Sequence, residues 1–175
     1  MVSDNIVSLV AHFEGFRARP YRDLGGVWTI GFGDTELPAK GVEYITREEA
    51  MQRLSERLSD NVNALLLDVG HGNYVSREVV EATASLAYNI GLRRAIESQW
   101  WKTCKQGQPN LVSLLRWRMA NGKYVYGLLR RRVAEALHAI GRDWRDYEKY
   151  DALARKVIDG KAFPVDLANK IVSIA

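Results

Sequence analysis

Two carboxylates and a hydroxyl lie within a short stretch near the start of the chain, at Glu14, Asp23 and Thr29. Apolar residues before Glu14 recur at the three-and-four spacing of one buried helix face, and Gly15 is a typical helix stop. We therefore expect Glu14 at a helix C-terminus. The negative end of the helix dipole and apolar neighbours both favour the protonated form of a carboxyl group there, which suits a general acid.

The pattern after Gly15 predicts a small β structure. Pro20 is incompatible with a continuing helix, and residues 21–33 contain short strand-like runs around Gly25-Gly26, a pair that favours a hairpin turn. Asp23 would then lie on a strand or at its end, more solvated than Glu14 and ionised. Hydrolysis of a glycosidic bond requires one carboxyl group of each kind, an acid for the leaving oxygen and a base or nucleophile on the other face.

The stretch 14–35, EGFRARPYRDLGGVWTIGFGDT, resembles the catalytic segment of the bacteriophage-type lysozymes, the endolysins of glycoside hydrolase family 24. The resemblance rests on residue types, spacing and glycine positions together. Looser matches follow at 41–42, 45–50, 87–91 and 127–135, so it covers roughly residues 4–144. It implies an α+β, predominantly α, lysozyme-like fold, with a small N-terminal β-sheet lobe and a larger helical lobe joined by a long helix.

The resemblance also implies a reaction and its residues. Glu14 corresponds to the general acid and Asp23 to the base or stabiliser of the transition state, while Thr29, by itself an ordinary strand residue, helps to position water. The implied enzyme is a muramidase that hydrolyses the β-1,4 bond between N-acetylmuramic acid and N-acetylglucosamine of bacterial peptidoglycan, with inversion and with no cofactor or metal. Candidate substrate-binding residues on the two lips of the implied cleft are Tyr88, Asn89, Phe32 and Thr35.

Asp34 departs from the family pattern. Members of the family commonly have a histidine directly after Gly-Phe-Gly, where this chain has Asp34. An ion pair made by that histidine is therefore not expected here, whereas Glu14, Asp23 and Thr29 are all in place.

The elements that must position these residues form one expected domain over 1–175. We expect a β lobe at about 15–45, a linking helix at 46–68, a helical lobe from 1–14 and 70–144, and additional C-terminal helices in 145–175. Ser3 or Asp4 can cap the first helix, and Thr46 with Glu49 forms a capping box for the linking helix. Residues 35–45 contain Pro38 and Gly41 and are expected to form a loop.

Hydrophobic spacing predicts the later elements. Helices are expected over 76–90, in a shorter piece through 96–101 that stops near 107, and over 111–119, 128–141, 143–158 and 165–174, with a turn at 121–122. The apolar tail residues are expected to pack on the larger lobe, with a partner surface as the alternative; they are Leu153, Val157, Leu167, Ile171, Val172 and Ile174. The run Arg130-Arg131-Arg132 is expected to be a solvated face, with attraction to an acidic wall polymer as the alternative.

Charge and cysteine content limit the partners and the compartment. The chain of 175 residues has a net charge of +4, which favours an acidic partner such as a cell wall, a nucleic acid or a membrane surface. Cys104 is the single cysteine, so no intrachain disulfide forms, and His12, His71 and His138 are too far apart for a metal motif. The N-terminus has neither a basic region nor a long apolar run, and we expect no stable membrane insertion.

Several alternatives stay open at the level of sequence. We expect a monomer made in the host cytoplasm that acts on the wall in the periplasm after release, and we expect no binding to nucleic acid. A non-catalytic peptidoglycan-binding relative and a lytic transglycosylase are the alternative functions. A helical nucleic-acid binder would fit the basic charge, but it gives no reason for the arrangement of Glu14 and Asp23.

Overall fold

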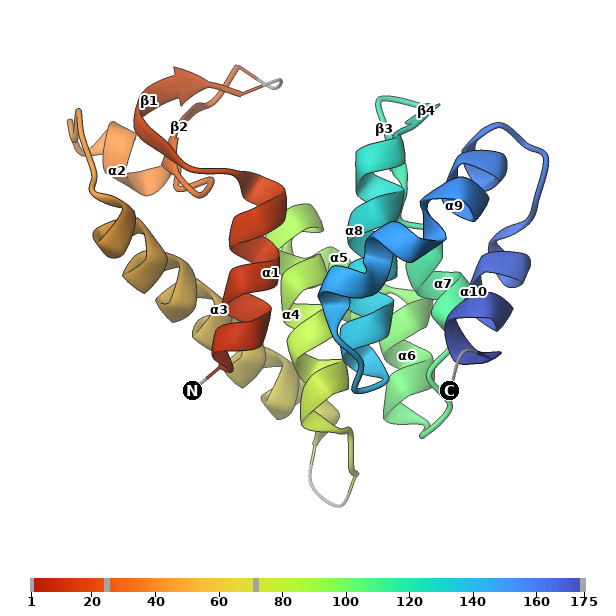
Figure 1. Ribbon diagram of the computed structural model, residues 1–175. Helices are drawn as coiled ribbons and strands as arrows, with labels where there is room; N and C mark the ends of the chain where they lie inside the picture. Colours follow the sequence, from red (N-terminus) through yellow and green to blue (C-terminus); the bar gives the residue numbers. More distant parts are fainter. Residues whose placement is uncertain (1, 24–25, 71–72, 174–175) are drawn as a thin grey trace. The chain divides into compact units, whose positions relative to one another are not determined.

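The computed structural model describes residues 2–23, 26–70 and 73–173, and these are predominantly helical with two small two-stranded sheets (Figure 1). The chain divides into two compact units, Met1–Asp60 and Asn61–Ala175. Helix α3, Arg47–Val69, runs across the boundary between them. The fold class expected from the sequence, mainly helical with a little β structure, is confirmed.

Helix α1, Asp4–Glu14, opens the smaller unit with the predicted ends. The Ser3 hydroxyl accepts a hydrogen bond from the backbone N–H of Ile6 at 3.4 Å, so Ser3 is the N-cap. Gly15 ends the helix with φ = +69°, a conformation that favours glycine. The helix therefore stops directly after Glu14, as the sequence predicts.

Strands β1, Arg17–Arg22, and β2, Trp28–Gly31, form an antiparallel hairpin. Tyr21 pairs with Thr29, and the register shifts between Arg17 and Tyr21. Pro20 lies within this irregular part of β1, where its missing N–H leaves no regular ladder bond to break. In the predicted turn, Gly26 has φ = +78°, while Gly25 lies outside the described residues.

The prediction of a continuous loop over 35–45 is wrong, because α2 covers Glu36–Ala39. The carboxylate of Asp34 accepts hydrogen bonds from the backbone N–H groups of Glu36 at 2.8 Å and Leu37 at 3.1 Å. These bonds satisfy free donors at the helix start. Pro38 fits within this first turn, where its missing N–H costs no helix hydrogen bond.

Helix α3 begins with the predicted capping box. The backbone N–H of Thr46 donates to the carboxylate of Glu49 at 2.9 Å, and the backbone N–H of Glu49 donates to the Thr46 hydroxyl at 3.2 Å. Each residue thus satisfies a donor of the other.

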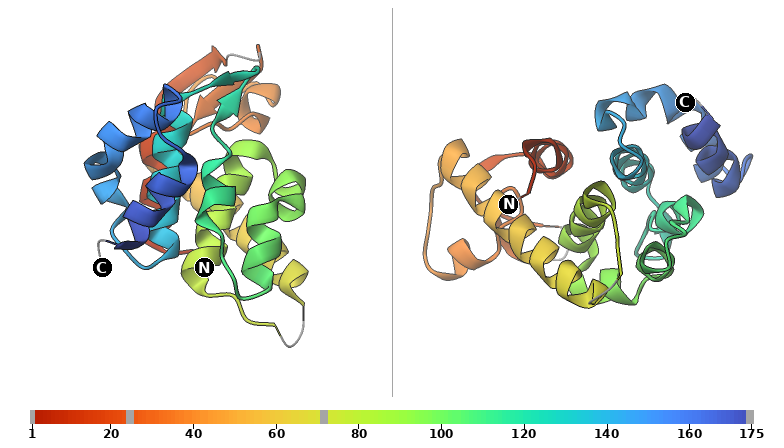
Figure 2. Two further views of the ribbon diagram at one scale, coloured as in Figure 1. Left: turned by 90° about the vertical axis from the view of Figure 1, so that its right-hand side faces the viewer. Right: turned by 90° about the horizontal axis from the view of Figure 1, so that it is seen from below.

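The larger unit consists mainly of short helices (Figures 1 and 2). Its elements after α3 are α4 (Arg77–Ile90), α5 (Leu92–Glu97), α6 (Gln99–Lys105), α7 (Leu111–Leu115), β3 (Met119–Ala120), β4 (Lys123–Tyr124), α8 (Tyr126–Ala139), a 3-10 helix η1 (Trp144–Tyr150), α9 (Asp151–Ile158) and α10 (Pro164–Ser173). Ser76 caps α4 and Gly91 ends it, both as predicted.

Three boundaries differ from the prediction. The helical piece around 96–101 is two helices, because the Ser98 hydroxyl accepts from the N–H of Trp101 and starts α6 anew. The helix predicted over 111–119 ends at Leu115, and Met119 belongs to the β3–β4 hairpin. At the base of that hairpin the Arg118 carbonyl accepts from the N–H of Val125 at 2.8 Å. The first predicted tail helix begins with the 3-10 turns of η1.

Helix α8 is central to the packing of the larger unit. It is in contact with α4, α7, η1, α9 and α10. The core also holds two tryptophans whose ring nitrogens are satisfied. Trp100 donates to the Thr83 hydroxyl at 2.9 Å, and Trp101 donates to the Asp68 carboxylate at 2.7 Å.

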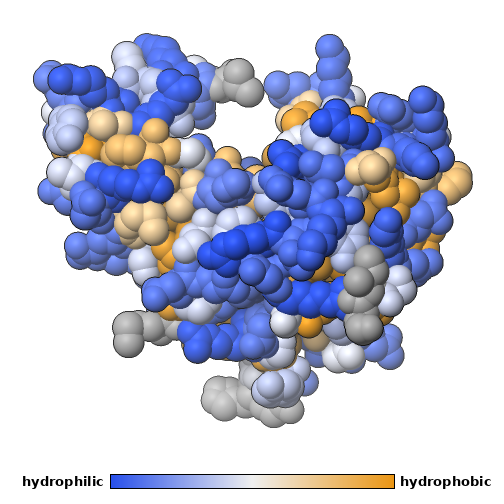
Figure 3. All heavy atoms as spheres, viewed as in Figure 1, coloured by the Kyte–Doolittle hydropathy of each residue, from blue (hydrophilic) through white to orange (hydrophobic). Residues whose placement is uncertain are grey.

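The tail packs partly as predicted. Val157, Leu167 and Ile171 are buried and Leu153 is half-buried, but Val172 is 58% exposed, so its predicted burial is wrong. Val172 lines a cavity of about 400 Å³ between α10 and the segment 108–112, which includes the start of α7. Figure 3 shows that some hydrophobic side chains reach the surface among the hydrophilic ones. Ile174 lies outside the described residues.

The structure bears on membrane insertion and on the chemistry of the single cysteine. Within the described ranges, no helix combines the length and the apolar character needed to cross a membrane. Cys104 is a free and buried thiol, and burial raises its pKa to about 12.

Candidate active site

Glu14, Asp23 and Thr29 all belong to the smaller unit. Glu14 is the last residue of α1 and is half-buried, whereas Asp23 follows β1 directly and is exposed. Thr29 lies on β2 and is 4% exposed. The two carboxyl groups therefore have the different degrees of solvation that the sequence predicts.

Val27 joins Asp23 to Thr29 through its backbone. Its N–H donates to Oδ1 of Asp23 at 2.8 Å, and its carbonyl accepts both the N–H of Asp23 at 3.0 Å and the hydroxyl of Thr29 at 3.1 Å. A hairpin turn thus fixes the carboxylate and the hydroxyl relative to each other. The hydroxyl proton of Thr29 is used in this bond. The Thr29 oxygen can therefore only accept a hydrogen bond from any further partner.

Tyr21, which pairs with Thr29 across the hairpin, is a further candidate residue that the sequence did not single out. Its pKa is raised, first by burial and then by the negative charges of Glu14 and Asp23, against the opposing charge of Arg17. The signal available in the sequence was its place opposite Thr29 in the predicted hairpin, two residues before Asp23.

The four candidates for substrate contact lie in different settings. Phe32 is 2% exposed and lies against Phe16, with ring centroids 5.4 Å apart. Thr35 is exposed and precedes α2. In the larger unit, Tyr88 is half-buried and Asn89 is exposed, both in the last turn of α4.

The Arg130-Arg131-Arg132 run is not a solvated face, so that prediction is wrong. Arg131 is 3% exposed and Arg132 is fully buried, while Arg130 is half-buried and ion-paired with Asp151 at 3.0 Å. Burial of the first two is possible because α8 also carries Glu135, a fully buried carboxylate.

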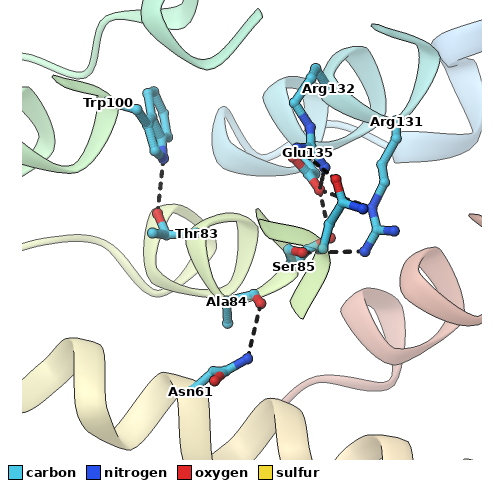
Figure 4. A network of polar contacts seen from close by, with 9 residues as sticks. Asn61, Thr83, Ala84, Ser85, Trp100, Arg131, Arg132 and Glu135 are labelled. Carbon is cyan, nitrogen blue, oxygen red and sulfur yellow. Dashed lines mark hydrogen bonds and ion pairs between the residues drawn. The ribbon is translucent and has the colours of Figure 1, made fainter. Parts of the chain in front are cut away.

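Oε1 of Glu135 is the centre of a polar network between α8 and α4 (Figure 4). It accepts from Arg132 Nη2 at 2.6 Å, from Arg131 Nε at 3.3 Å and from the Ser85 hydroxyl at 2.7 Å. Arg131 also donates to the Ser85 carbonyl at 3.2 Å. A buried charge is tolerated when it is paired and hydrogen-bonded in this way. Arg132 further donates from Nη1 to Oδ1 of Asn89 at 3.3 Å.

Asp34 forms a second buried charge cluster, in the smaller unit. It is 5% exposed, and its Oδ2 accepts from Nε of Arg53 at 2.7 Å. Burial acts to raise the pKa of Asp34, but the hydrogen bonds from Arg53 and from the backbone N–H groups of Leu37 and Glu36 outweigh it and hold the pKa below its usual value. Asp34 thus makes an ion pair of its own where the family resemblance suggests a histidine.

The histidines and acids do not gather into a metal site among the residues with described positions. His138 is buried, and its Nε2 lies 3.0 Å from the Glu81 carboxylate in the core of the larger unit. His12 is exposed and His71 lies outside the described residues.

Comparisons with known proteins place these features in a family. The family model described as phage lysozyme matches residues 11–135. An endolysin of Acyrthosiphon pisum secondary endosymbiont phage 1 is 31% identical over 140 residues, which are 77% of this chain and 94% of that protein.

Two solved structures are also similar. The endolysin from Escherichia coli O157:H7 phage FAHEc1 has a TM-score of 0.69 and 27% identity, covering 81% of this chain and 94% of that one. The muramidase domain of SpmX from Asticaccaulis excentricus has a TM-score of 0.66 and 26% identity, covering 77% of this chain and 94% of that one.

Proposed function

The chain belongs to the phage lysozyme family, and we propose that it hydrolyses the β-1,4 bond between N-acetylmuramic acid and N-acetylglucosamine of peptidoglycan, with Glu14, Asp23 and Thr29 as its catalytic residues. The chain is a muramidase of the endolysin type. The observation that carries the residue assignment is the link through Val27, which holds Asp23 and Thr29 in one hairpin while α1 ends at Glu14 in the same unit.

The proposed chemistry divides the work between the two carboxyl groups. Glu14 gives its proton to the glycosidic oxygen as the bond to the sugar breaks, so the leaving hydroxyl departs neutral. Asp23 acts as the base that takes the proton of the attacking water, and it stabilises the positive charge that develops on the sugar ring. The half-buried position of Glu14 at the end of α1 and the exposed position of Asp23 after β1 support this division, because the two roles require carboxyl groups in different surroundings.

Thr29 is proposed to hold the attacking water as a hydrogen-bond acceptor. Its hydroxyl proton is bonded to the Val27 carbonyl at 3.1 Å, so the water must donate to Thr29. A water that donates one proton to Thr29 and the other to Asp23 keeps a lone pair for the sugar carbon. Attack from the face opposite the leaving group gives inversion at that carbon.

The first prediction concerns Glu14. Glu14→Gln keeps the shape of the side chain but removes the proton, so the rate of turbidity decay of permeabilised Gram-negative cells should fall by about 10²- to 10⁴-fold with unchanged thermal stability. Glu43→Gln is the matched control, since Glu43 is an exposed loop residue of the same unit, and it should lyse cells like the wild type. Wild-type lysis by the Glu14 variant would refute the assignment.

The released muropeptides identify the reaction. Hydrolysis leaves N-acetylmuramic acid with a free reducing end, and inversion gives initially the α-anomer. A lytic transglycosylase would leave an anhydro product of lower mass, because no water is added. Mass spectrometry of the fragments, with NMR of the first-formed anomer, therefore separates hydrolysis from transglycosylation and inversion from retention.

The similarity to endolysins supports a proposal about where the protein acts. We propose that the protein is made in the host cytoplasm as a monomer and acts on the wall in the periplasm after release. Binding to intact sacculi without loss of turbidity would instead indicate a non-catalytic wall-binding relative.

A further inference from the structure

Asn89 is held from one side by a buried arginine. Its side chain is exposed near the end of α4, and its Oδ1 accepts a hydrogen bond from Nη1 of Arg132 at 3.3 Å. Arg132 lies on α8 and is fully buried. The exposed amide therefore rests on a side chain that cannot move freely.

The position of Arg132 is fixed by the network around Glu135 (Figure 4). Nη2 of Arg132 donates to Oε1 of Glu135 at 2.6 Å, and the Ser85 hydroxyl donates to the same oxygen at 2.7 Å. Ser85 and Asn89 are one helical turn apart on α4. The network thus ties the guanidinium of α8 to the helix that carries Asn89.

Arginine decides which way the amide of Asn89 faces. A guanidinium has hydrogen-bond donors and no acceptor, so only the amide oxygen of Asn89 can face it. The NH₂ group, on the other arm of the planar amide, is then the part left for a ligand. Asn89 consequently offers a hydrogen-bond donor, its NH₂ group, on the side that faces away from Arg132.

We propose that Arg132 is a positioning residue that orients Asn89 to donate a hydrogen bond to an acceptor oxygen of the glycan. The acceptor is the carbonyl of an N-acetyl group or a sugar hydroxyl oxygen. This inference rests on the proposed function, because it takes Asn89 to contact the substrate. It goes further in assigning the direction of the hydrogen bond and a binding role to a buried arginine.

Asn89→Asp tests the direction of the hydrogen bond. The new carboxylate still accepts from Arg132 but has no proton to donate, so thermal stability should be kept while apparent KM for sacculi rises about 5- to 10-fold, with kcat little changed. Asn89→Ala should raise KM to a similar degree. An unchanged KM in the Asn89→Asp variant would overturn the proposal, because the donor would then be unused.

Arg132→Lys tests the positioning role. A lysine keeps the charge but lacks the planar fork that bonds Glu135 and Asn89 together, so KM should rise without a matching loss of kcat. The matched control is Arg130→Lys, two residues earlier on α8, which likewise keeps the charge but loses the guanidinium hydrogen bonds to Asp151 and Glu148 instead. The control should lower the melting temperature but leave KM unchanged. Equal KM changes in both variants would mean that only stability is involved, and if Arg132→Lys does not fold, the two Asn89 variants decide.

The acceptor and the proposed function can be tested separately. On sacculi from which N-acetyl groups have been removed, the penalty of Asn89→Asp should disappear if the acceptor is the acetamido carbonyl and persist if it is a hydroxyl. Binding of the same variants in a Glu14→Gln background to intact sacculi, measured by co-sedimentation, needs no catalysis. Suppose that these variants bind sacculi more weakly than Glu14→Gln alone, but that the wild-type protein does not hydrolyse sacculi. The hydrolase assignment would then be refuted, while the proposed hydrogen bond would stay supported.

Discussion

At the scale of single residues, Asp34 connects three parts of the smaller unit. Its backbone forms a bridge with Ile30 through hydrogen bonds of 2.8 and 2.9 Å, its Oδ1 caps α2, and its Oδ2 pairs with Arg53 on α3. The turn after β2 is therefore fixed by one buried carboxylate. A histidine could not accept hydrogen bonds on two oxygens in this way.

The second prediction follows from the lowered pKa of Asp34. A group whose pKa is lower in the folded than in the unfolded state stabilises the fold above the unfolded value, near 3.9, and this contribution is lost as the pH falls through the lower, folded value. Asp34→Ala should therefore cost about 2 kcal/mol of unfolding free energy at pH 7, and the difference from wild type should shrink below about pH 4.

Urea denaturation of the Asp34 variant and the wild type at pH 7 and pH 3 measures this difference. Glu43→Ala, an exposed carboxylate of the same unit, should change stability little at either pH. A cost for Asp34→Ala that stays constant across this range would show that the carboxylate charge is not what stabilises the turn.

At the scale of elements, the turn between β2 and α2 depends on Gly31. It has φ = +66°, and a Cβ atom placed on it would lie 3.1 Å from Cβ of Ala50 at the start of α3. Both the backbone conformation and the close approach of α3 therefore favour glycine.

The third prediction separates these two reasons. Gly31→Ala should destabilise the protein more than Gly41→Ala, because Gly41 has a similar φ of +80° but open space around it. The backbone term should be about 1–2 kcal/mol in both variants, and the excess at Gly31 measures the crowding against Ala50. Thermal melting of the two variants gives the comparison. Equal losses would show that α3 yields to the added methyl group.

Local signals made many of the elements predictable. Ser3, Gly15 and the Thr46–Glu49 pair define helix ends within a few residues of themselves, so the sequence alone places them. Helix α2 and the early end of α7 depend instead on the Asp34 carboxylate and on the pairing of Arg118 with Val125. Such hydrogen bonds override the intrinsic secondary-structure preference of the segment. A prediction from residue patterns uses only that preference, so it misses them.

The candidate site shows the same division. Glu14 and Asp23 were placed by helix and hairpin signals. The buried setting of Arg132 depends instead on its hydrogen bonds to Asn89 and to Glu135, whose carboxylate also accepts from Ser85. Ser85 and Asn89 lie more than 40 residues earlier in the chain. Three adjacent arginines predict a solvated face when only charge is considered. The clue lay in Glu135, three residues after Arg132 on a helix otherwise rich in apolar residues.

At the scale of the whole molecule, the positive charge is concentrated in one part of the chain. Residues 91–125 contain seven lysines and arginines and one glutamate, a net charge of +6, so the remainder carries a net charge of −2. Lys102, Arg116 and Lys123 are exposed, and none has an ion pair within the described ranges. Peptide stems of the wall carry carboxylates, so we expect this segment to contribute to attraction toward the wall.

The last prediction compares two variants of equal charge. Replacing Lys102, Arg116 and Lys123 by glutamine should lower the lysis rate at low salt by several-fold and flatten its dependence on ionic strength. Replacing Lys156, Lys161 and Lys170 of the tail by glutamine removes the same charge from exposed positions outside this segment and should have a smaller effect. Equal effects would mean that net charge alone governs attraction. Lysis rates across a series of salt concentrations provide the measurement.

The buried thiol of Cys104 has a consequence for a protein that passes from a reducing cytoplasm to an oxidising periplasm, the route proposed above. A single cysteine cannot form an internal disulfide, and burial with a pKa of about 12 keeps its sulfur protonated and out of reach of a second molecule. The fold therefore does not depend on whether its surroundings oxidise or reduce thiols. Passage between the two compartments would therefore leave this thiol, and the packing around it, unchanged.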